Sequence, residues 1–225
     1  RTKAVLFGSP SNPTGAAQSA GDLTALVALA EREDFWLVSD EIYDRLTYTG
    51  THTSTAAIPG AWDRTVLLNG FSKSYAMTGW RVGWMVVPPD HVRTVERLAQ
   101  NMFICPPHAS QVAALAALDC AGEADANLAV YAENRRLMLE ELPKAGFDRI
   151  APPEGAFYIY ADVSHLTGDS LAFAAEILEK AGVAVTPGLD FDPERGARTL
   201  RFSYARSTAD IAEGLRRLAE FMAAR

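Results

Sequence analysis

Short apolar runs alternate with helix-like segments over the first 90 residues of the chain. Four runs are apolar on both faces and end near turn residues or prolines, as buried strands do: 3–8, 35–38, 65–68 and 81–87. Between the first two runs, apolar residues recur at helical spacing. Strands that alternate with helices predict an α/β fold, with a mainly parallel sheet sandwiched by helices.

The rest of the chain follows a helical period first and then mixes the two periods. Three helices are predicted in the middle of the chain, over 90–101, 107–120 and 124–145. Beyond them, strand-like segments at 156–161, 183–186 and 199–203 alternate with predicted helices at 171–181 and 208–222. We therefore predict three parts: an α/β part over 1–123, an interdomain helix over 124–145 and a small α+β domain over 146–225.

Composition narrows the class of protein. The chain has 225 residues, 48% of them hydrophobic and 22% charged, as in ordinary globular domains. Its 21 Lys and Arg residues are scattered and outnumbered by 28 Asp and Glu, which gives a net charge of −7, so we expect no nucleic-acid partner. No apolar run reaches the length of a membrane span, and we expect no membrane contact.

Cysteines and histidines give no sign of a metal site. Cys105 and Cys120 lie outside any metal-binding or disulfide pattern, which favours a reducing, cytoplasmic location. The four histidines lack ligand spacing and are interpreted as surface or structural side chains: His52, His91, His108 and His165. We therefore predict that the protein holds no metal ion.

Polar residues gather where three predicted strands end, and open α/β sheets bind their ligands at such ends. The segments are NPTG at 12–15, DEIY at 40–43 and GFSKS at 70–74, and Arg81 follows the last of them. Each has an ordinary interpretation when taken alone, as a turn, a helix cap or a surface lysine. Their joint occurrence, in this order and at the ends of three predicted strands, favours a catalytic or ligand-binding site.

Four segments resemble the fold-type I, class I pyridoxal-phosphate aminotransferases, and most of all the bacterial aspartate aminotransferase subgroup that carries MTGWR: SPSNPTG, SDEIYDRL, NGFSKSYAMTGWRVGW and RFSYARS. The spacings agree as well, with 28 residues from Asn12 to Asp40, 33 from Asp40 to Lys73 and eight from Lys73 to Arg81. The resemblance covers the whole chain. It implies that 1–123 is the carboxyl-terminal part of the cofactor-binding large domain.

The resemblance implies that Lys73, Asp40 and Tyr43 carry the chemistry. Lys73 would hold pyridoxal 5′-phosphate as a Schiff base and, once the substrate displaces it, shuttle a proton. Asp40 would keep the pyridine nitrogen of the cofactor protonated, so that the ring accepts electrons from the substrate. Tyr43 and Asn12 would donate hydrogen bonds to the 3′ oxygen of the cofactor.

The resemblance also implies which residues bind the two anionic groups. Arg81 would help hold the cofactor phosphate, and Arg201 would bind the substrate α-carboxylate together with Asn12, since a guanidinium forms bidentate pairs with both kinds of anion. The family often has a phosphate-binding serine where this chain has Gly70. Ser72 is a candidate to replace that serine as a ligand of the phosphate.

Three further expectations follow from the family pattern. The Asn12–Pro13 bond is a candidate cis peptide, because X-Pro bonds tolerate that form. The segment 187–196 (PGLDFDPERG) departs from the shorter family form, which leaves its contribution to the substrate mouth open. We also expect a further segment before Arg1, without which these 225 residues would bind the cofactor poorly and leave an apolar sheet edge exposed.

The function implied is transfer of an amino group between an amino acid and a 2-oxo acid, by a homodimer because the active sites of the family lie at the subunit interface. Two alternatives stay open. A lyase of the same fold, such as a β-eliminating C–S lyase, shares every residue named above. A non-catalytic, aminotransferase-like regulatory module is the other, although the retention of Lys73, Asp40 and Arg81 argues against a decayed site.

Overall fold

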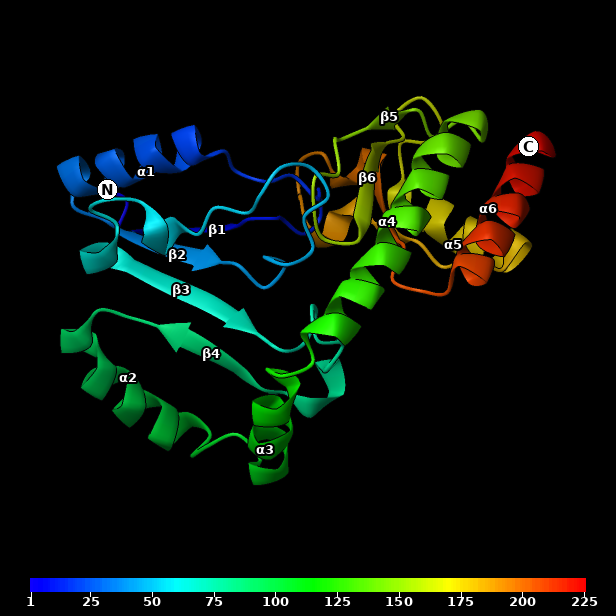
Figure 1. The fold of residues 1–225 in the computed structure, drawn as a ribbon. Coiled ribbons are helices and arrows are strands. Elements are labelled where there is room, and N and C mark those ends of the chain that lie inside the picture. The colour runs from blue at the N-terminus through cyan, green and yellow to red at the C-terminus, as the bar shows by residue number, and fades with distance from the viewer. The chain divides into compact units, whose positions relative to one another are not determined.

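The computed structural model describes residues 1–225 and divides the chain into two compact units. Unit 1 contains residues 1–11 and 17–126, and unit 2 contains residues 12–16 and 127–225 (Figure 1). Helix α4 (Ala121–Lys144) belongs to both, since the units divide after Ala126. The predicted division of the chain at residues 123 and 145 stays a prediction. No helix combines the length and the apolar character that crossing a membrane requires.

Unit 1 is built on a four-stranded sheet in the order β1-β2-β3-β4 (Figure 1). Its strands are Ala4–Gly8 (β1), Trp36–Asp40 (β2), Thr65–Gly70 (β3) and Gly83–Val86 (β4). The first three strands run parallel, and β4 runs antiparallel to β3. The predicted α/β fold with a mainly parallel sheet is therefore confirmed.

The register of this sheet brings four positions of the chain to one edge. Gly8 pairs with Asp40, which pairs with Leu68 on its other side. Gly70 pairs with Gly83. The residues that follow β1, β2 and β3, and those that precede β4, therefore leave the sheet at the same edge. Ligands bind at this edge in open α/β sheets.

Two helices of unit 1 lie on opposite faces of β2. Helix α1 (Ala20–Glu33) packs its buried apolar residues in one cluster with Leu37. Helix α2 (Pro89–Met102) brings the ring of His91 against Trp36, with ring centres 4.7 Å apart. Because adjacent residues of a strand point to opposite faces, α1 and α2 cover different faces of the sheet.

Three features of unit 1 correct the expectations from sequence. Only β1 and β2 are joined by an α-helix, since the segment 41–64 between β2 and β3 contains none. Residues 71–82 turn the chain back, so β4 runs antiparallel. Not every strand is covered on both faces, because Leu6 of β1 and Met85 of β4, the two outermost strands, are 71% and 48% exposed.

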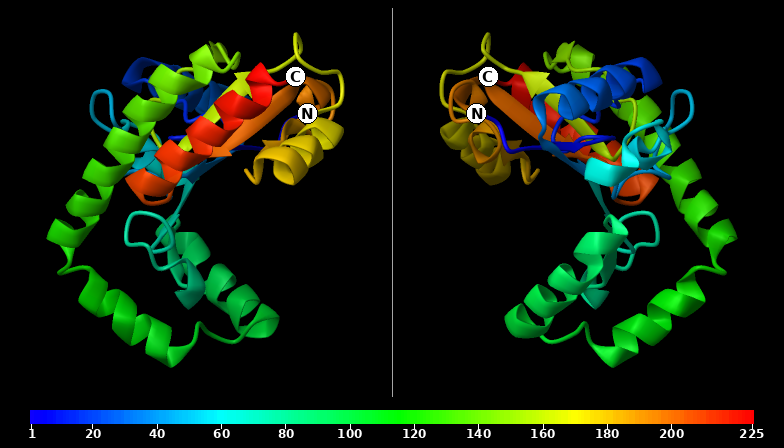
Figure 2. Two further views of the ribbon diagram at one scale, coloured as in Figure 1. Left: turned by 90° about the vertical axis from the view of Figure 1, so that its right-hand side faces the viewer. Right: turned by 90° about the vertical axis from the view of Figure 1, so that its left-hand side faces the viewer.

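Unit 2 contains a second sheet, which is antiparallel and has the order β5-β6-β8-β7. Its strands are Arg149–Ile150 (β5), Tyr158–Asp162 (β6), Thr186–Pro187 (β7) and Thr199–Ser203 (β8). Helices α5 (Ser170–Ala181) and α6 (Thr208–Ala223) lie side by side in this unit (Figure 2). The expected α+β fold of this part is confirmed, but β5 was not predicted, and the strand predicted at 183–186 is wrong except at its last residue.

Side-chain alternation gives the sheet of unit 2 a buried apolar face and a second, more polar one. On β8, Leu200 and Phe202 are buried in the core. Arg201 lies between them in sequence and so points to the opposite face. Tyr160 of β6 pairs with Arg201 across the sheet and shares that face. The residue predicted to bind the substrate carboxylate is therefore kept out of the apolar core.

Candidate functional site

Asp40 ends β2 and opens the polar turn that carries Tyr43. The Asp40 Oδ1 atom accepts a hydrogen bond of 3.1 Å from the backbone amide of Ile42. No helix follows, so the carboxylate closes a local turn instead of capping a helix. The Tyr43 side chain is buried, and the Lys73 Nζ lies 5.8 Å from the centre of its ring. Two of the residues predicted to carry the chemistry are thus neighbours across the sheet edge.

Lys73 lies in a compact turn that follows β3. Its carbonyl accepts a hydrogen bond of 3.0 Å from the Ala76 amide, and the Met77 amide donates to the Phe71 carbonyl at 3.1 Å. Phe71 and Met77 are buried against Ala114 of helix α3 (His108–Ala117). Apolar packing on both sides of Lys73 therefore holds its backbone in place while the amine reaches the polar edge.

Arg81 and Ser72 belong to the same turn system. The Arg81 Nη1 donates to the Thr78 carbonyl at 2.9 Å, and the Thr78 hydroxyl donates to the Ser72 carbonyl at 2.7 Å. Arg81 has a positive φ of 53°, a conformation that side chains other than glycine seldom adopt. This strained backbone conformation and the hydrogen bond to Thr78 hold the guanidinium beside the turn of Lys73.

Gly70 has no room for the serine that the family often has at this position. A Cβ atom built there would lie 2.9 Å from the Gly83 Cα and 3.2 Å from the Val82 carbonyl oxygen. Both are backbone atoms, one in β4 and one in the residue before it, so they cannot move aside at little cost. Glycine at this position therefore fits the close approach of β3 and β4, and serine does not.

Gly70→Ser is accordingly expected to destabilise the protein by roughly 1–3 kcal/mol, as overpacking does. The measurement is thermal unfolding of the natural protein without cofactor. Gly79→Ser is the matched control, because nothing lies within 4 Å of a Cβ at Gly79. An unchanged unfolding temperature for Gly70→Ser would contradict the steric explanation.

The Arg201 side chain contacts four other residues of unit 2. Its Nη1 donates to the Asn12 Oδ1 at 2.7 Å, and its Nη2 donates to the Thr186 hydroxyl at 3.3 Å. The guanidinium carbon lies 4.4 Å from the centre of the Tyr158 ring and 4.7 Å from that of Phe191. The Nε atom is buried and has no hydrogen-bond partner within the protein. This arrangement keeps a cation oriented and leaves N–H donors of the guanidinium, Nε–H among them, for a ligand.

The segment 12–16 belongs to unit 2 by its contacts. The Asn12–Pro13 peptide is cis, as predicted, and so is Ser9–Pro10. The Gly155 amide donates to the Gly15 carbonyl at 2.8 Å and thereby ties the segment to this unit. Phe191, which stacks on Arg201, comes from the segment 187–196 that departs from the family form, and so gives that segment a definite place at the arginine.

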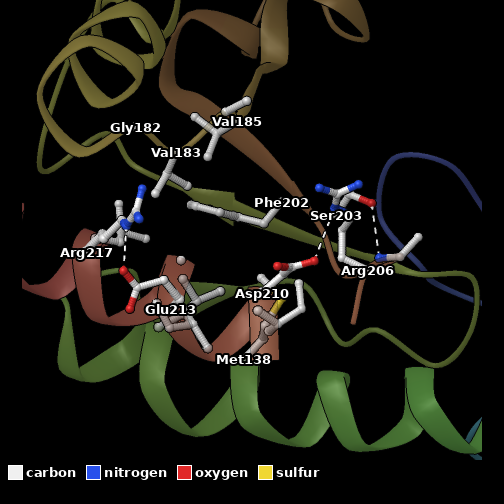
Figure 3. Close-up of a pocket in the computed structure, with 17 residues that line it drawn as sticks. Met138, Gly182, Val183, Val185, Phe202, Ser203, Arg206, Asp210, Glu213 and Arg217 are labelled. Carbon is white, nitrogen blue, oxygen red and sulfur yellow. Dashed lines mark hydrogen bonds and ion pairs between the residues drawn. The ribbon is translucent and has the colours of Figure 1, made fainter. Parts of the chain in front are cut away.

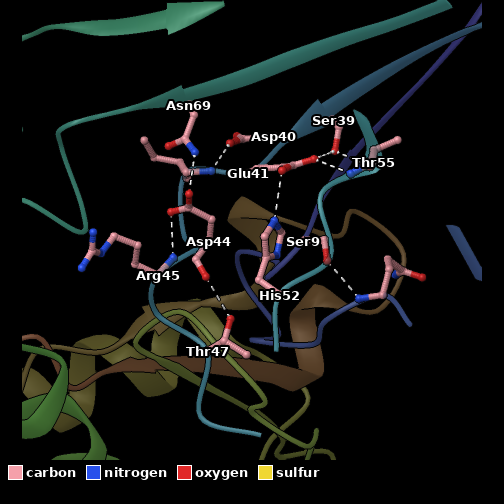
Figure 4. Close-up of polar contacts among 12 residues, drawn as sticks. Ser9, Ser39, Asp40, Glu41, Asp44, Arg45, Thr47, His52, Thr55 and Asn69 are labelled. Carbon is pink, nitrogen blue, oxygen red and sulfur yellow. Dashed lines mark hydrogen bonds and ion pairs between the residues drawn. The ribbon is translucent and has the colours of Figure 1, made fainter. Parts of the chain in front are cut away.

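Sequence reasoning missed a buried polar network beside Asp40 (Figure 4). The Glu41 Oε1 accepts hydrogen bonds from the Ser39 hydroxyl at 3.0 Å and from the Thr55 amide at 2.9 Å. The Glu41 Oε2 lies 3.0 Å from the His52 Nε2. The available signal was the strand period, because Leu37, Ser39 and Glu41 alternate onto the face that packs against α1.

Glu41 is ionised in this network. Burial alone would raise the pKa of its carboxyl, but the hydrogen bonds outweigh that effect and hold the pKa below its ordinary value; their donors are His52, Thr55, Ser54 and Ser39. A carboxylate can only accept, so the His52 Nε2 carries the hydrogen. Because folding lowers this pKa, the carboxylate stabilises the fold near neutral pH, and this contribution is lost as the pH falls through the folded-state value.

A separate cavity of about 630 Å³ lies within unit 2 (Figure 3). Its walls include apolar side chains of α4, β8 and α6. Two ion pairs also line it, Arg206 with Asp210 and Arg217 with Glu213. Phe202 lines this cavity and lies on the face of β8 opposite to Arg201. None of the predicted site residues lines it.

The predicted residues thus form two groups. The structure brings five of them to one sheet edge of unit 1: Asp40, Tyr43, Ser72, Lys73 and Arg81. Asn12 and Arg201 form a hydrogen-bonded pair in unit 2. The roles of both groups stay predictions at this point.

Comparison with known proteins finds one family and several relatives that match nearly the whole chain. The family described as Aminotransferase class I and II matches residues 1–218. The valine–pyruvate aminotransferase of Mycobacterium tuberculosis is 45% identical over 98% of this chain, and the aspartate aminotransferase of Thermotoga maritima is 37% identical over 100% of it. In both cases 57% of the relative is covered, so the chain spans little more than half the length of these curated relatives.

Solved structures share the fold closely. A Silicibacter pomeroyi protein provisionally described as an aminotransferase has a TM-score of 0.94 at 64% identity, with 99% of this chain and 59% of that one covered. An aminotransferase from Mycobacterium tuberculosis has a TM-score of 0.91 at 45% identity, with coverages of 99% and 58%.

Proposed function

This chain belongs to the family of class I and II aminotransferases, and we propose that the protein transfers an amino group between an amino acid and a 2-oxo acid, with pyridoxal 5′-phosphate as its cofactor. The observation that carries the proposal is the location of three residues, Lys73, Asp40 and Arg81, in the segments that adjoin one edge of the sheet. Relatives named as valine–pyruvate, aspartate and arginine–pyruvate aminotransferases support the same class of reaction.

The side chains at this edge fit that cofactor by their chemistry. Lys73 supplies the amine that bonds to an aldehyde, Asp40 a carboxylate for a protonated ring nitrogen, and Arg81 a guanidinium for a phosphate. Ser72 lies directly before Lys73, and we propose its hydroxyl as a second ligand of the phosphate. When bound, the cofactor ring accepts the electron pair of the substrate Cα.

We assign the chemical steps to residues of unit 1. The Lys73 amine, freed when the amino acid takes its place, carries the proton that leaves the substrate Cα. Asp40 holds a proton on the ring nitrogen of the cofactor, because a carboxylate favours a positive charge beside it. The Tyr43 hydroxyl donates a hydrogen bond to the phenolic oxygen of the cofactor, and the Lys73 Nζ lies 5.8 Å from the centre of the Tyr43 ring.

Substrate binding falls to unit 2 in this proposal. Arg201 binds the α-carboxylate of the amino acid, and its unpaired, buried Nε is the donor that supports this role. Asn12 accepts from Arg201 and thereby orients the guanidinium. The expected hydrogen bond of Asn12 to the cofactor stays a prediction.

The half-reaction tests the proposal. The natural protein loaded with cofactor is mixed with valine, aspartate or arginine and no 2-oxo acid. We expect one 2-oxo acid per site to form, the cofactor to stay in its aminated form, and an added 2-oxo acid to restore the starting spectrum. Continuous release of ammonia and a 2-oxo acid without an acceptor would indicate the β-eliminating lyase instead. Stable cofactor binding without turnover of any amino acid would indicate the non-catalytic module.

We also propose a homodimer in the cytoplasm. Helix α2 and the residues that follow it expose large apolar side chains: Val92, Leu98, Met102, Phe103 and Ile104. Extended apolar surface of this kind is typical of protein interfaces. Both cysteines are unpaired, which suits a reducing compartment.

A further inference from the structure

Glu41 lies between Asp40 and Tyr43, two residues of the proposed cofactor site. Its backbone amide donates to the Leu68 carbonyl of β3 at 2.9 Å, and its carbonyl accepts from the Asp44 amide at 2.9 Å. The turn is therefore attached to the neighbouring strand at one end and closed on itself at the other. A shift of Glu41 would move both of its functional neighbours.

The Glu41 side chain is anchored by residues that are distant in sequence. Thr55 binds one carboxylate oxygen and His52 the other, and both come from the long connection between β2 and β3 (Figure 4). Adjacent residues of an extended chain point to opposite faces, so this network lies behind Asp40, away from the face that its carboxylate serves.

We propose that Glu41 and His52 are a positioning pair, which holds the turn from Asp40 to Tyr43 in the geometry that the cofactor ring requires. This inference rests on the proposed function, because the requirement exists only where such a cofactor binds. Neither residue touches the cofactor in this proposal, and both act through Asp40 and Tyr43.

The chemistry of the pair supports positioning over simple packing. Only 3% of the Glu41 side chain is exposed, and a buried carboxylate is costly unless it is paired, so an apolar side chain would fill the same space at lower cost. Hydrogen bonds to both carboxylate oxygens set the direction of the side chain as well as its depth. Among the groups that bond to the carboxylate, His52 is the only titratable one.

Three variants of the natural protein test the pair. His52→Phe removes the donor, His52→Gln keeps one, and His91→Phe is the matched control, since His91 contacts Trp36 on the other face of the same strand. The first measurement is amide hydrogen exchange of residues 40–46 in the cofactor-free protein. The second is the pH midpoint of the visible absorption of the lysine-bound cofactor.

We expect His52→Phe to speed exchange in this turn about tenfold, as loss of a hydrogen bond to a charged group does. We expect it to shift the pH midpoint by about half a unit, because the contacts of Asp40 and Tyr43 with the cofactor loosen. His52→Gln and His91→Phe should both stay near the parent protein.

Two results would overturn the inference. Faster exchange with an unchanged pH midpoint would make the pair a structural element only, and equal shifts in His52→Phe and His91→Phe would remove its specificity. These failures differ from failure of the proposed function, in which the parent protein itself would show no lysine-bound cofactor and the inference would fall with it.

Discussion

Replacing Lys73 with alanine is expected to abolish the visible absorption of the lysine-bound cofactor and to slow amino-group transfer by roughly 10²–10⁴-fold, the usual contribution of a positioned acid–base group. The loss has two origins, because the same amine holds the cofactor and carries the substrate proton. Since Arg201 is untouched, the rate constant should fall far more than amino-acid binding weakens. Absorption spectra and single-turnover rates measure the two effects separately.

Lys144→Ala is the control for this experiment. Lys144 is an exposed lysine of α4 that pairs with Glu140 and Glu141, so its removal should leave both the spectrum and the rate unchanged. Added small amines should restore part of the rate of Lys73→Ala, because a free amine can carry the missing proton. Survival of the absorption band in Lys73→Ala would show that another residue holds the cofactor.

The location of the proposed site residues at one edge of the sheet could be predicted, because the ends of strands can be recognised in the sequence. Apolar runs stop at Asp40 and Gly70, and parallel strands bring their carboxyl ends to one edge, so polar residues after them meet. The resemblance to a family then gave each residue a role. The resemblance also predicted the cis peptide at Asn12–Pro13.

The direction of β4, the glycine at position 70 and the pairing of Glu41 with His52 could not be predicted, because they depend on tertiary contacts that no local sequence pattern indicates. The direction of β4 follows from the turn at 71–82, and the absence of a side chain at Gly70 follows from its contact with Gly83. Glu41 and His52 are eleven residues apart, and only the fold of the connection between β2 and β3 makes them partners. A charged residue after an apolar strand normally lies at the surface, so the sequence alone does not indicate that Glu41 is buried.

Arg201→Lys is expected to weaken amino-acid binding by roughly 10–100-fold while cofactor binding changes little, since hydrogen bonds to charged groups contribute about 1.5–3 kcal/mol. Arg201 bonds to Asn12 and Thr186 through two different nitrogens, and its guanidinium lies over the rings of Tyr158 and Phe191. A lysine ammonium is a point charge without a planar face, and it cannot keep this geometry and offer two parallel donors to a carboxylate. Spectral titration with amino acid and fluorescence titration with cofactor measure the two affinities.

Arg198→Lys provides the comparison, because Arg198 directly precedes β8 and is exposed, and the same substitution there should leave both affinities unchanged. Equal losses of amino-acid and cofactor binding in Arg201→Lys would refute its assignment to the substrate carboxylate. The expected selectivity follows from the division of the residues themselves. Apart from Asn12, the groups assigned to the cofactor lie in unit 1, whereas Arg201 and its polar partners Asn12 and Thr186 lie in unit 2. The substitution at Arg201 should therefore weaken amino-acid binding far more than cofactor binding.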